Sequence, residues 1–177
     1  TSAIAAPAYA GIPVTHRGTV RSFAVITGHR LDDGAGAVQP EFPRADTLVF
    51  LMGVANLRPI VGKLMDAGWA ADTPAAVVRW GTTPDQETFV ASLESIAQRA
   101  EDVAPPAVLV VGPVVALRES LAWFERLPLF GKRVLVTRAR EQASTLARHL
   151  VRLGAAPLEL PAIAVQALSD TAELDAV

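Results

Sequence analysis

The stretch Thr47-Leu48-Val49-Phe50-Leu51-Met52-Gly53 has the form of a short buried strand that ends at a glycine. Residues 56–67, which follow it, carry apolar side chains at helical spacing, and Gly68 is well placed to end that helix. The apolar positions of this helix are Leu57, Ile60, Val61, Leu64 and Met65. A strand, a glycine turn and an amphipathic helix in succession are typical of an α/β domain.

The same alternation extends on both sides of this stretch. Further strands are predicted at residues 22–27, 75–78, 107–111 and 133–137, because each run is short, rich in valine and bounded by glycine, proline or polar residues. Residues 31–44 have no periodicity and contain two prolines, so they are predicted to form an exposed loop.

Two more helices are predicted from capping and spacing. Thr83-Pro84-Asp85-Gln86 has the pattern of a capping box with proline at the first helical position, and the stripe that follows would be buried. That stripe consists of Phe89, Leu93, Ile96 and Ala97. A helix over residues 141–153 would turn Leu146, Leu150 and Leu153 inward and end at Gly154.

Composition limits the classes of protein to consider. The chain has 177 residues, 51% of them hydrophobic and 19% charged, which suits one or two domains with a well-buried core. Its net charge is -2 and its lysines and arginines are scattered, so nucleic-acid binding has little support. Without cysteine there is no disulfide framework, thiolate metal site or cysteine nucleophile.

Nothing in the sequence indicates a membrane segment or a secretion signal. No apolar run approaches the roughly 20 residues that span a bilayer. The first ten residues are apolar, but they lack a basic start and are interrupted by Pro7. We therefore expect a cytoplasmic protein and, since the chain does not begin with methionine, an interior fragment.

Three predicted strands end at a glycine, and ligands of open α/β sheets favour the carboxyl ends of strands. These ends are Met52-Gly53, Trp80-Gly81-Thr82 and Gly112. A helix beginning after Gly81 would also expose backbone amides to polar ligand atoms. The alternative interpretations are that Met52 fills the core, that Gly53 is a helix-entry turn, and that Gly81 belongs to an ordinary strand-to-helix turn.

The order of several short motifs resembles one family. The motifs are Tyr9-x-Gly11-Ile12-Pro13-x-Thr15-His16-Arg17, Thr27-Gly28-His29, Met52-Gly53, Gly81-Thr82, Gly112-x-Val114-Val115 and Trp123-Phe124. Together they resemble the uroporphyrinogen-III C-methyltransferases of the tetrapyrrole methylase family along residues 1–125. The resemblance implies a mixed α/β sheet flanked by helices, forming the second domain of such an enzyme.

The resemblance also implies a reaction, a cofactor and a substrate. The family uses S-adenosylmethionine to methylate two ring carbons of uroporphyrinogen III, giving precorrin-2 for sirohaem or cobalamin. The matching cofactor-binding positions are Thr1, Ser2, Met52 and Gly81. No catalytic residue and no metal ligand are assigned, because the electron-rich pyrrole carbon and the sulfonium leaving group require mainly positioning.

Other features of the resemblance concern the substrate, the partner and the missing parts. His16 and Arg17, with Arg21, are candidates for binding the carboxylates of the substrate, or else they are interface or solvated residues near a hinge. The family implies a homodimer. Arg79 and Trp80 replace the family's frequent Glu and Asn, which leaves side-chain roles there open. Because the family's glycine-rich and Gly-Gly-Asp segments have no match, we expect this chain alone neither to bind the cofactor tightly nor to turn over.

A second resemblance begins after a short connector. Gly131-Lys132-Arg133-Val134-Leu135-Val136-Thr137-Arg138 is similar to the start of uroporphyrinogen-III synthase, with a second strand expected near residues 158–160; the alternative is one more generic βα unit. Thr137, Arg138 and Arg140 lie at a predicted strand end near a helix start, a suitable place for substrate carboxylates; the alternative for Arg140 is a solvated helix residue, and no catalytic role is assigned. An incomplete βαβ start of this kind would leave sheet edges uncovered.

The resulting division has four parts. Residues 1–21 end the cofactor domain, 22–126 form the second methyltransferase domain, 127–132 are a linker, and 133–177 begin the synthase. Two rival hypotheses remain: a methyltransferase acting on a later precorrin, and a non-catalytic α/β interaction or dimerisation module.

Overall fold

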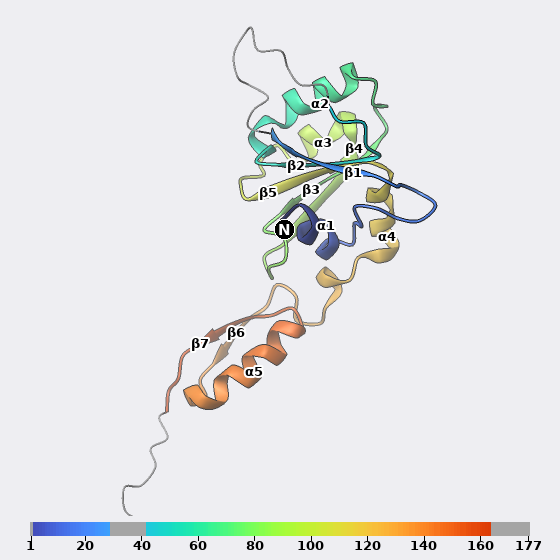
Figure 1. Ribbon diagram of the computed structural model, residues 1–177. Coiled ribbons are helices and arrows are strands. Elements are labelled where there is room, and N and C mark those ends of the chain that lie inside the picture. Colours follow the sequence, from blue (N-terminus) through green and yellow to red (C-terminus); the bar gives the residue numbers. More distant parts are fainter. Residues whose placement is uncertain (1, 29–41, 164–177) are drawn as a thin grey trace, which may run out of the picture. The chain divides into compact units, whose positions relative to one another are not determined.

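The computed structural model describes residues 2–28 and 42–163, with only the backbone given for residues 140–143. Within the chain, two compact units are distinguished, Thr1–Leu127 and Pro128–Val177 (Figure 1). Among the described residues, no helix combines the length and the apolar character needed to cross a membrane.

The first unit is built on a five-stranded mixed sheet in the order β1-β2-β5-β3-β4. The strands are β1 (Phe23–Thr27), β2 (Thr47–Leu51), β3 (Pro74–Arg79), β4 (Glu87–Ser92) and β5 (Ala107–Val111). β1 pairs with β2 in parallel, and all other neighbours are antiparallel. Because β2 and β3 both run antiparallel to β5, which lies between them, their carboxyl ends meet at the same edge of the sheet.

Helices cover both faces of this sheet. On one face lie α2 (Leu57–Asp66) and α3 (Leu93–Arg99), on the other α1 (Ser2–Tyr9), as Figure 1 shows. The face under α2 and α3 buries Phe50, Ile60 and Leu93 completely. The opposite face packs Ile12, Val49, Val110 and Val114 beneath α1 and the 3-10 helix η3 (Pro113–Leu117). The first unit continues through η2 (Val54–Asn56), α4 (Arg118–Leu121) and η4 (Phe124–Arg126).

Most predicted elements of the first unit are confirmed. β2 and β5 have the predicted bounds, β1 begins one residue later than predicted, and β3 is one residue longer at each end. The helix predicted over residues 56–67 is α2, and Gly68 follows it with a φ of 92° that suits glycine. Of the predicted loop over residues 31–44, only residues 42–44 are described, and they have no regular secondary structure.

The helix predicted to start at Thr83 is wrong in its first half. Residues 87–92 form β4, which pairs antiparallel with β3, and the helix begins only at Leu93. Phe89, Leu93 and Ile96 are spaced for a helix, but the pairing of β4 with the sheet outweighs that local signal. The proline and Gln86 therefore belong to a hairpin turn and not to a helix cap.

The second unit is a βαβ arrangement. Parallel strands β6 (Arg133–Val136) and β7 (Ala156–Glu159) are joined by α5 (Arg140–Arg152), and Gly154 follows the helix with a φ of 91°. β7 starts before the predicted residues 158–160. Leu146 and Leu153 were predicted to point inward, but they are 41% and 42% exposed. A two-stranded sheet offers the helix only a narrow strip, which is filled mainly by small residues such as Ala147 and Ala155.

Candidate functional site

A cavity of about 770 Å³ opens at the edge where β2 and β3 end. This volume is in the range of small-molecule sites. Its walls come from α1, from the segments after β2 and β3, and from the start of β5. The lining residues are Ser2, Ala6, Leu51, Met52, Val54, Ala55, Val78, Trp80, Gly81, Thr83, Pro105, Pro106, Ala107 and Val108.

Three of the four predicted cofactor-binding residues line this single cavity. Ser2 comes from α1, Met52 follows β2 and Gly81 follows β3. The fourth, Thr1, lies outside the described residues. Residues that are far apart in the sequence are thus brought together by the parallel direction of β2 and β3 and by the packing of α1 against the sheet.

The two strand ends share a local geometry. Met52 and Trp80 have positive φ values of 54° and 50°, and each is followed by a glycine. Left-handed backbone at a large side chain is uncommon and is frequently found at functional sites. Met52 is 65% exposed and Trp80 43%, so the alternative in which Met52 fills the core is wrong, whereas Gly53 does precede the helical turn η2.

Glycine allows close approach of two segments at two points, one in the cavity wall and one beside it. A Cβ added to Gly81 would lie 2.6 Å from the Cβ of Ala6, so α1 packs directly on the backbone of this turn. A Cβ on Gly28 would lie 2.5 Å from the Cα of Gly53, which brings the predicted Thr27-Gly28 motif against the Met52-Gly53 motif. Side chains at either point would separate these elements.

The turn after β3 is held by its own hydrogen bonds. The amide of Trp80 donates to the carbonyl of Pro106 (3.1 Å), and the Thr83 hydroxyl donates to the carbonyl of Trp80 (2.7 Å). The amides of Thr82 and Thr83 donate within the turn, to the Gln86 side chain and to Trp80. The expectation of a helix N-terminus with exposed amides here is wrong, because the helix is absent and these two donors are already used.

The described lining of the cavity is largely apolar and carries no ionisable side chain. Ser2 and Thr83 supply hydroxyl groups, and Trp80 supplies an indole N–H. Such a lining can position a ligand and exclude water, but it offers no side chain for general acid or base catalysis. Within residues 2–28 and 42–163, no cluster of His, Asp or Glu suited to holding a metal ion is found.

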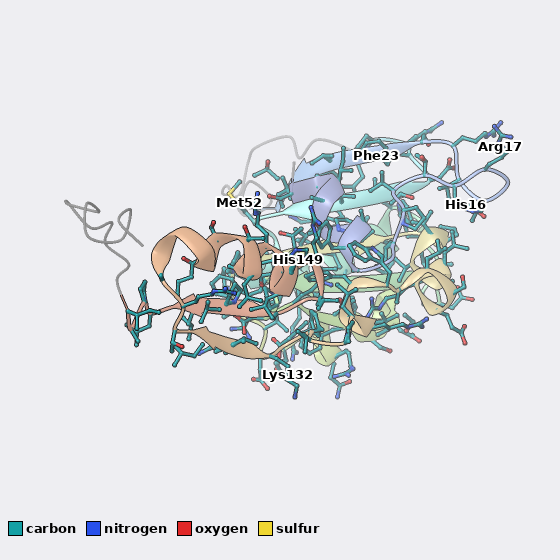
Figure 2. The ribbon with its side chains drawn as sticks, turned by 90° about the horizontal axis from the view of Figure 1, so that it is seen from below. His16, Arg17, Phe23, Met52, Lys132 and His149 are labelled. Carbon is teal, nitrogen blue, oxygen red and sulfur yellow. The ribbon has the colours of Figure 1, made fainter. Side chains whose placement is uncertain are left out.

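The predicted substrate-binding pair lies elsewhere. His16 and Arg17 are exposed on the loop before β1, far from Met52 in the view of Figure 2. The loop is closed by a bridge between His16 and Val20, and His16 Nδ1 lies 3.3 Å from the Thr19 hydroxyl. The structure does not bring this pair to the cavity, so substrate binding by these residues stays a prediction.

Of the other two arginines discussed from the sequence, Arg21 bonds through its backbone amide and Arg79 through its guanidinium. Arg21 and Ser22 donate their backbone amides to the Asp46 carboxylate, at 2.8 and 3.1 Å, which ties the start of β1 to that of β2. Hydrogen bonds from the Arg21 amide, and then from Ser22, lower the pKa of Asp46. Arg79 forms an ion pair with Glu87 (2.9 Å) across the hairpin.

Some lining residues were missed by reasoning from the sequence. Ala6 gave no signal beyond its small size, and Pro105, Pro106 and Ala107 were interpreted only as the end of a helix and the start of a strand. Pro105, Pro106 and Ala107 reach the cavity because β5 runs between β2 and β3 in the opposite direction, so that the start of β5 lies beside the ends of its neighbours.

Comparisons with known proteins show which proteins this chain is similar to. Residues 1–97 match the family model described as Tetrapyrrole (Corrin/Porphyrin) Methylases. The Porphyrin biosynthesis protein HemD of Ruminiclostridium josui is 42% identical over 169 residues, which cover 93% of this chain and 34% of that protein. The Uroporphyrinogen-III C-methyltransferase of Bacillus subtilis is 38% identical over 170 residues, covering 91% of this chain and 34% of that protein.

Solved structures of uroporphyrin-III C-methyltransferase from Thermus thermophilus share the fold. One has a TM-score of 0.57 at 36% identity and covers 68% of this chain and 51% of its own. Another, complexed with S-adenosyl homocysteine, has a TM-score of 0.53 at 34% identity, with coverages of 62% and 49%. The chain spans about a third of the length of the curated relatives named above.

Proposed function

The chain belongs to the tetrapyrrole (corrin/porphyrin) methylases, and on this premise we propose that it forms part of an S-adenosylmethionine-dependent C-methyltransferase acting on uroporphyrinogen III. The product would be precorrin-2, on the way to sirohaem or cobalamin. S-adenosylmethionine is the methyl donor of this family, and one solved relative carries S-adenosyl homocysteine.

The observation that carries the proposal is the convergence of Ser2, Met52 and Gly81 on one cavity. These positions were selected from family motifs, and they lie in α1, after β2 and after β3. The cavity lies at the carboxyl ends of strands, where ligands of α/β sheets are expected. We propose that it receives the cofactor, with Thr1 as a further contact.

The residues that line the cavity suit a reaction governed by positioning. When bound, S-adenosylmethionine supplies a methyl group on a sulfonium, which is an excellent leaving group. Met52 and Trp80 would hold the cofactor against apolar surface and exclude water, and the hydroxyl group of Ser2 is available to its polar atoms. No ionisable group is required from this part of the chain.

The apolar lining also indicates that this chain alone would bind the cofactor only weakly. None of the described lining residues has a charge to pair with the amino acid end of the cofactor. We therefore propose that the 177-residue chain neither binds the cofactor with micromolar affinity nor catalyses methyl transfer by itself.

For residues 133–177 we propose the start of a uroporphyrinogen-III synthase, in a bifunctional protein whose second activity supplies the substrate of the first. The support is the parallel βαβ arrangement of β6, α5 and β7. In addition, the 169-residue similarity to the R. josui protein is too long for the first unit alone and therefore extends into the second.

The proposed partner is a second copy of the chain, in a homodimer, which sedimentation would test.

A methyl-transfer assay tests the proposed reaction. The complete coding sequence that contains this chain would be expressed and incubated with S-adenosylmethionine and uroporphyrinogen III, or with a later precorrin. A product carrying two added methyl groups, formed from uroporphyrinogen III, is the expected result. Methylation of the later precorrin only would favour the first rival hypothesis, and no transfer to either would favour an interaction module.

A further inference from the structure

A network of sheltered polar side chains lies outside the cavity and is centred on Glu125 in η4. The Glu125 carboxylate accepts hydrogen bonds from the Gln86 amide (2.8 Å), from the Thr88 hydroxyl (2.6 Å) and from the Arg118 guanidinium. None of the residues in this network lines the cavity. The network is therefore separate from the proposed cofactor contacts.

The network has two ends, and each end is attached to a different wall of the cavity. At one end, the side-chain oxygen of Gln86 accepts from the amide of Thr82 (2.9 Å), beside Gly81. At the other, Arg118 donates to the carbonyl of Ala10, directly after α1. A continuous chain of hydrogen bonds thus connects the turn that carries Gly81 with the helix that carries Ser2.

The end of α1 is also attached to residues 123–125, the segment that contains Glu125. The indole N–H of Trp123 donates to the carbonyl of Ala8 (3.1 Å). The ring of Tyr9 packs on those of Trp123 and Phe124, with centroids 5.1 and 4.8 Å apart. Because Glu125 follows these rings directly, the α1 contact and the turn contact are made by one short segment.

Burial distinguishes this network from an ordinary surface ion pair. Gln86 is only 4% exposed, and the side chains of Arg118 and Glu125 are 17% and 21% exposed. By contrast, the side chains of the Arg58–Glu101 pair are 70% and 61% exposed. Removing one member of a sheltered network leaves the others without partners, whereas an exposed pair exchanges its partner for water.

We propose that Glu125 is a positioning residue, which through Gln86 and Arg118 fixes the separation of α1 and the turn after β3 and so keeps the cofactor cavity in shape. The inference rests on the proposed function in taking this cavity as the ligand site. Burial raises the pKa of Glu125, but hydrogen bonds from Thr88, Gln86 and Arg118 outweigh this and leave the pKa below its ordinary value. The carboxylate is therefore charged near neutral pH.

Amide hydrogen exchange in the 177-residue chain tests the connection. The variant is Arg118→Ala, which removes the α1 end of the network without touching Thr82. We expect exchange at the Thr82 amide to become about tenfold faster, along with exchange at Ile12, whose amide donates to Pro7 at the end of α1 (2.8 Å). Arg58→Ala serves as the matched control and should leave both amides unchanged.

Two further variants distinguish loss of the network from general misfolding. Glu125→Gln keeps the size of the side chain, and Thr88→Val is nearly isosteric and removes one hydrogen bond to the carboxylate without changing charge. Both are expected to speed exchange at Thr82, and Glu125→Asp should restore part of the protection. Unchanged exchange at Thr82 in Arg118→Ala, or an equal increase at all amides of residues 1–127, would overturn the proposal.

Titration with S-adenosylhomocysteine, followed by the same amide signals, adds a readout of the cavity itself. Glu125→Gln should weaken binding about tenfold while the protein remains folded, and Glu101→Gln should not. Equal affinity of Glu125→Gln and the unchanged chain would overturn the positioning role. If the unchanged chain shows no binding at millimolar ligand, the proposed function fails, and the exchange experiment still decides whether Glu125 connects the two walls.

Discussion

Gly81→Ala should damage the first unit and its cavity together, because the added methyl group has no space. Its Cβ would lie 2.6 Å from the Cβ of Ala6 and 3.1 Å from its Cα. Non-bonded carbon atoms prefer separations of about 3.5–4.0 Å, so α1 would have to move by about 1 Å. The backbone of Gly81 is outside the left-handed region, so this collision alone determines the effect.

The expected loss follows from the cost of overpacking. Inserting a methyl group into a packed contact costs about 1–3 kcal/mol. Urea unfolding followed by tryptophan fluorescence measures this loss, and the method isolates the first unit because all three tryptophans, at positions 69, 80 and 123, lie in it. Binding of S-adenosylhomocysteine should weaken as well, since the displaced helix carries Ser2.

Gly62→Ala is the matched control for this change. Gly62 lies inside α2 with nothing within 4 Å of an added Cβ, so alanine should stabilise the unit by about 1 kcal/mol through its higher helix propensity. Unfolding of Gly81→Ala at the same urea concentration as the unchanged chain, or at a higher one, would mean that the added methyl group does not collide with α1.

Three other changes test the core of the first unit, the charge of Glu125 and the surface of the second unit. Phe50→Ala removes a fully buried ring and should lower the free energy of unfolding by about 3–5 kcal/mol in the same urea assay, whereas a loss below about 1 kcal/mol would contradict the assigned core. Because the pKa of Glu125 is lowered in the folded protein, its charged carboxylate stabilises the fold. This stabilisation is complete above the unfolded pKa of about 4.3 and is lost as pH falls through the folded pKa. The stability difference between the unchanged chain and Glu125→Gln should therefore be larger at pH 7 than at roughly pH 3; an equal difference at both would count against the lowered pKa. Leu158→Lys, at an exposed position of β7, should change the thermal unfolding of the second unit by no more than about 0.5 kcal/mol, and a larger loss would mean that this side chain is buried in solution.

Local patterns were sufficient for the elements whose burial follows their own sequence. β2 is a continuous apolar run, α2 has an unambiguous stripe, and Gly68 marks its end. The same applies to half of the site, since Met52 directly follows one predicted strand and Gly81 lies three residues beyond the end of another. In these places the short-range signal and the tertiary packing favour the same structure.

The remaining features depend on contacts between distant residues. Gln86 was interpreted as part of a helix cap, but its side chain binds Glu125, 39 residues away. Residues 87–92 form a strand only because β3 is beside them. The contact between Ala6 and Gly81 requires α1 to lie across the sheet, and neither residue type indicates it. Reasoning from local sequence has no access to such pairings.

The cavity at the ends of β2 and β3 is proposed to be the cofactor site. Titrating the isotopically labelled 177-residue chain with S-adenosylhomocysteine, and following its backbone amides by NMR, shows where the ligand binds. We predict shifts at Ser2, Met52 and Gly81 and none at Arg58 or Glu101, with a dissociation constant of about 1 mM. Shifts confined to other parts of the chain, or no shifts at several times that concentration, would contradict it.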